Sequence, residues 1–159
     1  MTFKKILVAL ERKSEQSPAI FALGLGLAEK GPAQILVFHC LPRHTVAEIE
    51  DRVGTLAELE GSQTLAKQDQ WLKGASEHID AWLEGFCRQA RDKGLEATSM
   101  VDVGRPGNSI VRTAGKWGAD LIVMGRPLRG ALSGLIRGGV GGWVLHHATC
   151  SVLFVHEAL

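Results

Sequence analysis

The chain has 159 residues, enough to bury the core of one domain and too few to suggest two, so we expect a single domain over residues 1–159. The net charge of +1 gives no broad field for steering nucleic acid, and the apolar run after the N-terminal lysines covers only Ile6 to Leu10, far short of a membrane span. We therefore expect a cytoplasmic protein that binds neither nucleic acid nor a membrane. Three widely spaced cysteines without a CxxC pair indicate buried free thiols rather than disulfides or a metal site.

Apolar runs alternate with helical patterns along the chain. The runs at residues 4–10 and 33–41 are short, continuous and rich in branched residues, which is typical of parallel strands covered on both faces. Ser14 or Ser17 can cap the first helix, and Pro18 suits its first turn. In chain order, we predict strand 4–10, helix 19–31, strand 33–41, helix 64–94, strand 95–104, helix 107–118, strand 119–125, helix 141–148 and strand 151–159. Strands alternating with helices predict an α/β fold with a doubly wound parallel sheet.

A glycine-rich stretch, "MGRPLRGALSGLIRGGVGGWVLHHATC", follows the fourth predicted strand and holds seven glycines in its first nineteen residues. In open parallel sheets ligands bind beyond the carboxyl ends of the strands, where glycines let backbone amides approach an anion. Neither GxxxxGK[ST] nor a GxGxxG after the first strand is present, and glycine content alone favours a mobile connection to the next helix. Both interpretations remain open at this level.

Three segments resemble the universal stress protein family: "KKILVAL", "VDVGRPGNSIVRTA" and "ADLIVMGRPLRGALSGLIRGGVGGWVLHHATCSVLFV". The resemblance implies a Rossmann-like sheet of five parallel strands in the order 3-2-1-4-5, of the adenine nucleotide alpha hydrolase type, with helices on both faces. It also implies a protein that is often homodimeric, in a family with one branch that binds ATP. The nucleotide-binding positions that it implies are Ala9, Glu11, Cys40, Met124, Gly125, Pro127, Leu128, Gly138, Gly139, Val140 and Gly141.

The glycine-rich stretch departs from the pattern of the ATP-binding branch, which is Gly, two residues, Gly, nine residues, Gly, then Ser or Thr. Gly125 and Gly138 match, but Leu128 stands at the second glycine and removes easy access to positive φ. Gly139 and Gly141 stand where that branch has hydroxyls. Each lost donor to a charged acceptor weakens binding by roughly 1.5–3 kcal/mol.

Other groups of the stretch and its surroundings are still suited to a nucleotide. Arg126, Arg129 and Arg137 can supply positive charge, and Glu11 stands where the resemblance calls for an aspartate near the adenosine. We therefore expect that any nucleotide, whether ATP, ADP or AMP, is held by its adenosine more than by its phosphates.

Three functions are compatible with these residues: a regulatory module that binds an adenine nucleotide, a nucleotide-free dimeric adaptor, and an enzyme acting on phosphates. Turnover needs a general base or metal carboxylates, and the candidates are Glu11, Asp102 and Asp120, with no motif that arranges them. The binding module is favoured, and no catalytic residue is predicted. The resemblance places the strand 151–155 at one edge of the sheet, and because this strand is free of charge and proline, we expect a homodimer through that edge.

Histidines and tryptophans have ordinary interpretations. His39 in the second strand is predicted to be an interior histidine with its hydrogen bonds satisfied. His146 and His147 point about 100° apart on a helix and do not readily share a metal. Trp143 stands where the resemblance implies a charged residue, so we expect it to cover a pocket or a partner.

Overall fold

The computed structural model describes residues 1–42, 61–126 and 139–156. The nine elements in the described ranges correspond in type and order to those predicted. They are β1 Lys5–Ala9, α1 Ser17–Ala28, β2 Gln34–Pro42, α3 Gly61–Asp92, β3 Glu96–Gly104, α4 Pro106–Trp117, β4 Leu121–Gly125, α6 Val140–His147 and β5 Ser151–Val155. No helix in these ranges combines the length and the apolar character needed to cross a bilayer.

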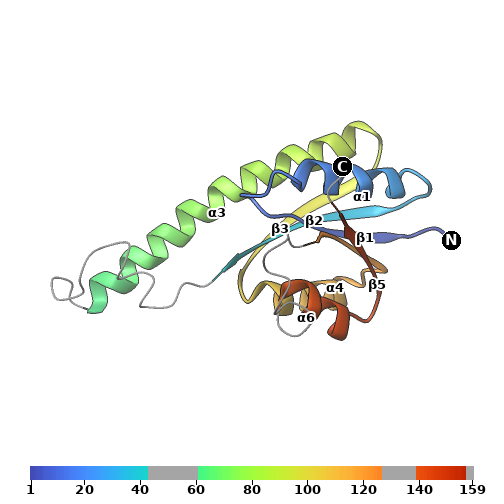
Figure 1. The fold of residues 1–159 in the computed structure, drawn as a ribbon. Helices are drawn as coiled ribbons and strands as arrows, with labels where there is room; N and C mark the ends of the chain where they lie inside the picture. Colours follow the sequence, from blue (N-terminus) through green and yellow to red (C-terminus); the bar gives the residue numbers. More distant parts are fainter. Residues whose placement is uncertain (43–60, 127–138, 157–159) are drawn as a thin grey trace.

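The five strands form one parallel sheet in the order β3-β2-β1-β4-β5, which confirms the predicted fold class and strand order. Ile6 of β1 pairs with Ile35 of β2 on one side and with Leu121 of β4 on the other. α1 and α3 cover one face of the sheet, and α4 and α6 cover the opposite face (Figure 1). The first half of α3 runs out past the sheet (Figure 1).

A separate hydrophobic core lies on each face of the sheet, because successive strand residues point to opposite sides. Ile6 and Val8 pack with α1 and α3, whereas Leu7 packs with α4 and α6. All three are fully buried, and each contributes roughly 1.5–3 kcal/mol of hydrophobic stabilisation. The continuous apolar strands predicted from the sequence therefore have the two-sided burial expected of a parallel sheet.

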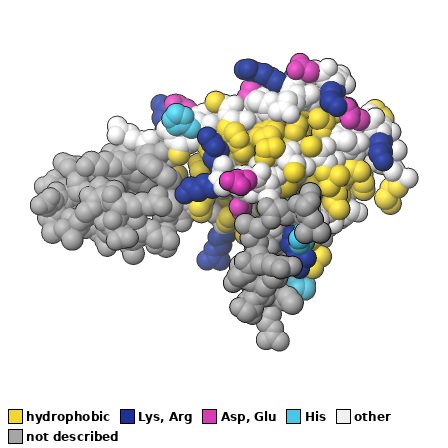
Figure 2. All heavy atoms as spheres, turned by 45° about the horizontal axis from the view of Figure 1, so that its top comes forward, with side chains coloured by type: hydrophobic (Ala, Val, Ile, Leu, Met, Phe, Trp, Pro, Cys, Tyr) yellow, Lys and Arg dark blue, Asp and Glu magenta, His cyan; other side chains and the backbone are white. Residues whose placement is uncertain are grey.

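The outer surface over α1 and α3 mixes charges of both signs. Figure 2 shows Lys and Arg side chains interspersed with Asp and Glu ones and with hydrophobic side chains on this face. One exposed ion pair joins the two helices, Lys93 Nζ to Glu29 Oε1 at 2.6 Å. Exposed pairs of this kind contribute at most about 1 kcal/mol, so the cores rather than the surface hold these helices on the sheet.

The start of α1 differs from the prediction. Its N-cap is Gln16, which makes no side-chain cap, and the helix begins at Ser17, although Pro18 lies in the first turn as predicted. The Ser14 hydroxyl accepts the Gln16 N–H at 3.2 Å, ahead of the helix, and the Ser17 hydroxyl donates to the Glu11 carbonyl at 2.7 Å. The predicted cap is wrong because both serines are used to hold the loop after β1.

Two glycines of α1 make a matched pair for testing how closely this helix packs on the sheet. A Cβ at Gly24 would lie 2.7 Å from Val8 Cγ2, whereas a Cβ at Gly26 would meet nothing within 4 Å. We expect Gly24→Ala to lower the free energy of unfolding by about 1–3 kcal/mol, because Val8 is fully buried and must shift. Gly26→Ala should raise it by about 0.5–1 kcal/mol through helix propensity. Urea denaturation checks both, and equal shifts in the two variants would contradict the close packing.

Candidate functional site

The strand order of the sheet reverses between β1 and β4. From β1 the chain goes to β2 on one side, and it later returns from β3 to β4 on the other side of β1. Ala9, the last residue of β1, pairs with Phe38 of β2 and with Met124 of β4. Such a reversal of strand order leaves a crevice outside the strand ends, where open α/β sheets bind their ligands.

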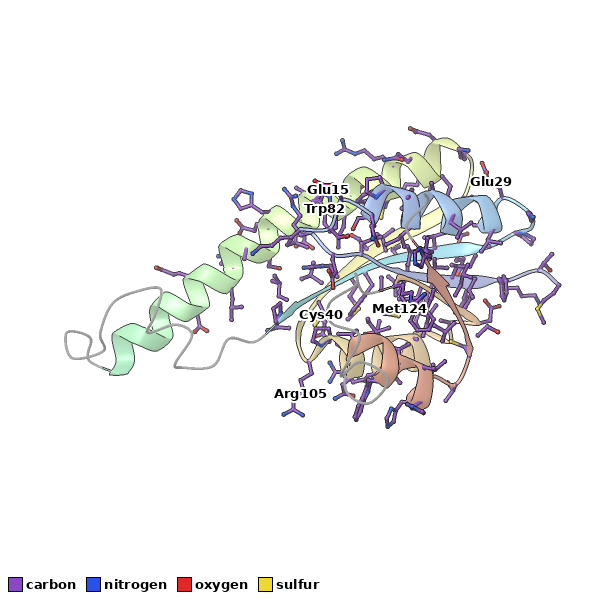
Figure 3. The ribbon with its side chains drawn as sticks, viewed as in Figure 1. Glu15, Glu29, Cys40, Trp82, Arg105 and Met124 are labelled. Carbon is purple, nitrogen blue, oxygen red and sulfur yellow. The ribbon has the colours of Figure 1, made fainter. Side chains whose placement is uncertain are left out.

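The sequence-predicted binding residues that the structure describes lie at this edge. Ala9 ends β1 and Glu11 follows it, Cys40 is near the end of β2, and Met124 and Gly125 end β4. Gly139 is the N-cap of α6, and Val140 and Gly141 open that helix. Pro127, Leu128 and Gly138 lie outside the described residues. In Figure 3, Glu15 and Trp82 lie above the strands, and Cys40 and Met124 lie below them.

β2 continues past the end of β1 and leaves backbone groups without a strand partner. Leu10 N–H donates to the Phe38 carbonyl at 2.9 Å, and this bond follows the last paired residues of β1. Carbonyls two residues apart on a strand face the same side, so the Cys40 carbonyl also faces β1, beyond its end. On its other side, Cys40 pairs with Asp102 of β3. The Cys40 carbonyl is thus placed to accept a hydrogen bond from a ligand.

Glu11 presents an exposed carboxylate at the mouth of the crevice. Its own carbonyl accepts hydrogen bonds from Ser14 N–H at 3.1 Å and from the Ser17 hydroxyl. Among the described residues, no ion pair or hydrogen bond engages its carboxylate. A carboxylate held on such a loop is suited to accept two hydrogen bonds from neighbouring hydroxyls.

The N-terminus of α6 also faces this edge. Gly139 has φ −84° and ψ 171° and provides no side-chain cap, so the first N–H groups of the helix lack the partner that a serine or threonine would supply. These amides and the helix dipole attract an anion. Gly139 and Gly141 contribute no side-chain hydroxyl donors at these positions.

Gln16 also lies at the end of β4, a position that the sequence did not reveal. A Cβ at Gly125 would lie 3.3 Å from Gln16 Oε1 and 2.8 Å from Ile20 Cδ1, so α1 closely approaches the end of β4. The Gln16 carboxamide therefore lies beside the strand end at the crevice. A glycine at the end of a strand is the signal that could have indicated a close neighbour.

A polar cluster made of Cys40, Asp102, Ser109 and Arg112 joins β2, β3 and α4. The Ser109 hydroxyl donates to Asp102 Oδ2, and Arg112 Nη2 reaches the same oxygen at 2.5 Å. Val103 N–H donates to Asp102 Oδ1 at 2.9 Å. Ser109 and Arg112 are three residues apart on one helix face, a spacing that could have placed both against the same partner.

The cluster sets the ionisation of its two acidic members. Burial alone would raise the pKa of Asp102, but hydrogen bonds from Ser109, Val103 N–H and Arg112 hold it below its ordinary value. Burial raises the pKa of the Cys40 thiol, and the charge of Asp102 adds to the rise, against hydrogen bonds with Ser109 and Gly104. The thiol therefore stays protonated at neutral pH and is a weak nucleophile.

Asp102→Asn is expected to lower the free energy of unfolding at pH 7 by about 1–3 kcal/mol, because charged hydrogen bonds are lost. A carboxyl whose pKa is depressed by folding stabilises the fold above its unfolded pKa, near 3.9, and loses that contribution as pH falls through the folded value. The difference between wild type and variant should therefore shrink below about pH 4. Denaturation curves from pH 7 to pH 3 check this, with the exposed Asp80→Asn as control. A difference at pH 3 as large as the difference at pH 7 would contradict it.

The histidine and tryptophan predictions have mixed outcomes. His39 is 8% exposed and its Nδ1 lies 2.7 Å from the Leu10 carbonyl oxygen, which confirms an interior, hydrogen-bonded histidine. Trp143 is 45% exposed, stacks on His147 at 3.9 Å between ring centroids, and lies 3.0 Å from the Cβ position of Gly107. It therefore packs α6 against α4. In the ranges that the structure covers, no group of three His, Cys, Asp or Glu could hold a metal ion.

Two of the three cysteines match the prediction of buried free thiols. Cys40 and Cys87 are buried and free, whereas Cys150 is free but only half-buried.

The strand order, with helices on both faces of the sheet (Figure 1), defines a doubly wound α/β protein. The model of the universal stress protein family matches residues 2–156. The chain is 33% identical over 158 residues to the universal stress protein Sll1388 of Synechocystis sp.. The aligned residues make up 99% of this chain and 100% of that protein. The chain therefore belongs to the universal stress protein family.

Solved structures share the fold across nearly the whole chain. The hypothetical protein MJ0577 superposes with a TM-score of 0.76 at 19% identity, covering 100% of this chain and 99% of that one. Universal stress protein UspA from Lactobacillus plantarum has a TM-score of 0.72 at 19% identity, covering 98% and 99%. Two more distant structures hold nucleotides. One is a universal stress protein in complex with cAMP, with a TM-score of 0.60, 16% identity and coverage of 98% and 98%. The other is the Archaeoglobus fulgidus protein in complex with dAMP, with a TM-score of 0.59, 18% identity and coverage of 97% and 98%.

Proposed function

We propose that this chain is a regulatory binding module that holds an adenine nucleotide at the carboxyl edge of its sheet and recognises the adenosine more than the phosphates. The observation that carries the proposal is the early end of β1 beside the longer β2, which leaves the Cys40 carbonyl facing the crevice. An amino group on the edge of a purine is the donor that such a carbonyl accepts. Glu11, two residues past the end of β1, offers an exposed carboxylate for the two ribose hydroxyls.

The phosphate end of the proposed site is weaker. The amides at the start of α6 remain, but Gly139 and Gly141 supply no hydroxyl donors. The two solved family members in complex with cAMP and dAMP carry nucleotides with a single phosphate, which supports a site in which the nucleoside contributes most of the affinity.

Calorimetric titration with ATP, ADP and AMP tests this proposal. AMP should bind within about a hundredfold of ATP, because about 2.7 kcal/mol is the most that the remaining amides and arginines are expected to add for two further phosphates. A preference for ATP above a hundredfold would show that the phosphates dominate. Mass spectrometry of ligand released from the purified protein distinguishes this module from a nucleotide-free adaptor, which would release none.

The carboxylates of the described residues favour binding over turnover. Asp102 is engaged by Ser109 and Arg112. Asp120 lies at the amino-terminal ends of the strands, away from the crevice. There its two carboxylate oxygens accept the N–H groups of Lys4 and Lys5 at 2.8 and 3.1 Å. Of the three carboxylates considered as catalytic candidates, Glu11 alone faces the crevice. Steady-state release of phosphate from ATP should therefore be undetectable.

We also propose that the protein is a homodimer formed through β5 and that it acts in the cytoplasm. β5 is an edge strand, and Ser151–Val155 carries no charge or proline to block pairing. Free thiols at Cys40, Cys87 and Cys150 suit a reducing compartment.

A further inference from the structure

The loop that carries Glu11 is held on both sides of this residue. A peptide unit is planar, so fixing a carbonyl also fixes the N–H of the next residue. The Leu10 carbonyl, which belongs to the peptide before Glu11, lies 2.7 Å from His39 Nδ1. The Glu11 carbonyl, which belongs to the peptide after it, accepts from Ser14 N–H and from the Ser17 hydroxyl. With both flanking peptides held, the direction of the Glu11 Cα–Cβ bond is set.

The hydrogen bond to Leu10 determines where the imidazole proton lies. A carbonyl oxygen can only accept, so His39 Nδ1 must be the donor and must carry a hydrogen. An apolar side chain could fill the same space in β2, but it has no donor for the Leu10 carbonyl. His39 is 8% exposed, so the bond is shielded from competing water.

A cluster of edge-to-face aromatic contacts holds the imidazole in place. Trp82 of α3 meets the His39 ring edge to face, with 5.9 Å between centroids and an 89° angle between planes. The Arg12 guanidinium lies 5.5 Å from the centre of the Trp82 ring, and Phe86 packs against the same ring at 5.4 Å. Trp82 of α3 therefore contacts Arg12 directly and Leu10 through His39. These are the two neighbours of Glu11.

We propose that His39 is a positioning residue for nucleotide recognition. Its Nδ1–H holds the Leu10 carbonyl so that the Glu11 carboxylate points to the ribose end of the crevice. The proposal rests on the proposed function, since it concerns the same site. It goes further because it assigns part of the adenosine affinity to a buried side chain on the opposite face of the sheet from Cys40.

Three substitutions separate the donor from the ring. Asn places its amide nitrogen as many bonds from Cβ as Nδ1 is, so His39→Asn keeps the donor and loses the ring. In His39→Gln the amide nitrogen lies one bond further from Cβ, as far as Nε2 does in histidine, so this variant has a donor at the wrong position. His39→Phe keeps a ring without any donor. If the hydrogen bond positions Glu11, the affinity for AMP should stay within about threefold of wild type in His39→Asn and should fall about tenfold in both other variants.

The experiment measures AMP affinity of the full chain by calorimetry, together with amide hydrogen exchange of residues 10–14 without nucleotide. Exchange there should be faster than in wild type in the Gln and Phe variants and close to wild type in the Asn variant. Full affinity in His39→Phe with lost affinity in His39→Asn would overturn the proposal in favour of simple packing. Equal affinity and exchange in all three variants would overturn it as well. Failure of wild type to bind AMP would instead contradict the proposed function, and the exchange rates would still report whether His39 holds the loop.

Discussion

Replacing Leu128 by glycine together with Gly139 by serine is expected to strengthen ATP binding by roughly 10- to 100-fold. The serine returns one hydroxyl donor to the start of α6, where the structure has an N-cap without a side-chain donor. One such donor to a charged phosphate contributes roughly 1.5–3 kcal/mol, which is the origin of the expected factor. Leu128 lies outside the described residues, and its replacement follows from the family pattern of glycines. Calorimetry with ATP measures the change.

AMP provides the control for this double substitution. Its affinity should change by less than about threefold, because the proposed adenosine contacts at Cys40 and Glu11 are untouched. Equal gains for ATP and AMP would show that the substitutions do not act on the β- and γ-phosphates, which only ATP carries. Unchanged ATP affinity would show that this stretch does not face the phosphates.

Val152→Pro combined with Phe154→Lys is expected to convert a homodimer into a monomer. Within the described residues, β5 is one edge of the sheet and has β4 as its only strand partner, so its other side offers amides and carbonyls for pairing. Two copies can pair antiparallel about a two-fold axis, which brings Leu153 and Phe154 of each copy close to their equivalents. Proline removes a ladder donor and lysine places a charge in the contact. Light scattering at micromolar concentration gives the mass.

The other edge strand of the sheet, β3, supplies a matched control. Met100 on β3 is 41% exposed, and Met100→Lys should leave the dimer intact while adding the same charge to an edge strand. A monomer mass for wild type would contradict the dimer. A dimer that survives the double substitution would place the interface elsewhere.

The order and type of the elements could be predicted from local patterns. The runs containing Ile6–Val8 and Ile35–Phe38 are apolar without alternation, and they are buried on both faces as a parallel sheet requires. In α3, Ile79, Leu83 and Phe86 follow the helical period and are all buried. Such patterns depend on residues close in the sequence, so the sequence alone displays them.

Contacts between distant residues could not be predicted in the same way. His39 reaches Leu10 across 29 positions, and Gln16 approaches Gly125 only because α1 packs over β4. The first helix also illustrates competition: Ser14 and Ser17 were both suitable caps, but their hydroxyls are engaged by the loop after β1. Local propensity does not determine which of two satisfactory partners a hydroxyl selects in the folded chain.

The proposed adenosine contacts were predicted only through the family resemblance. Ala9, Cys40 and Met124 are unremarkable apolar residues of buried strands, and their proposed role uses backbone groups that every residue has. What distinguishes these positions is the register that ends β1 beside a longer β2, which no side-chain pattern records.

A nuclear magnetic resonance titration of the wild-type chain with AMP tests the central claim most directly, because backbone amide shifts report where the nucleotide binds. The account predicts that the largest shifts occur at Leu10, Glu11, Leu41 and Gly125, with little change at Lys4 and Lys5 on the opposite edge of the sheet. Shifts confined to β5 or to the amino edge, or no shifts at millimolar AMP, would contradict an adenosine site in the crevice between β1 and β4.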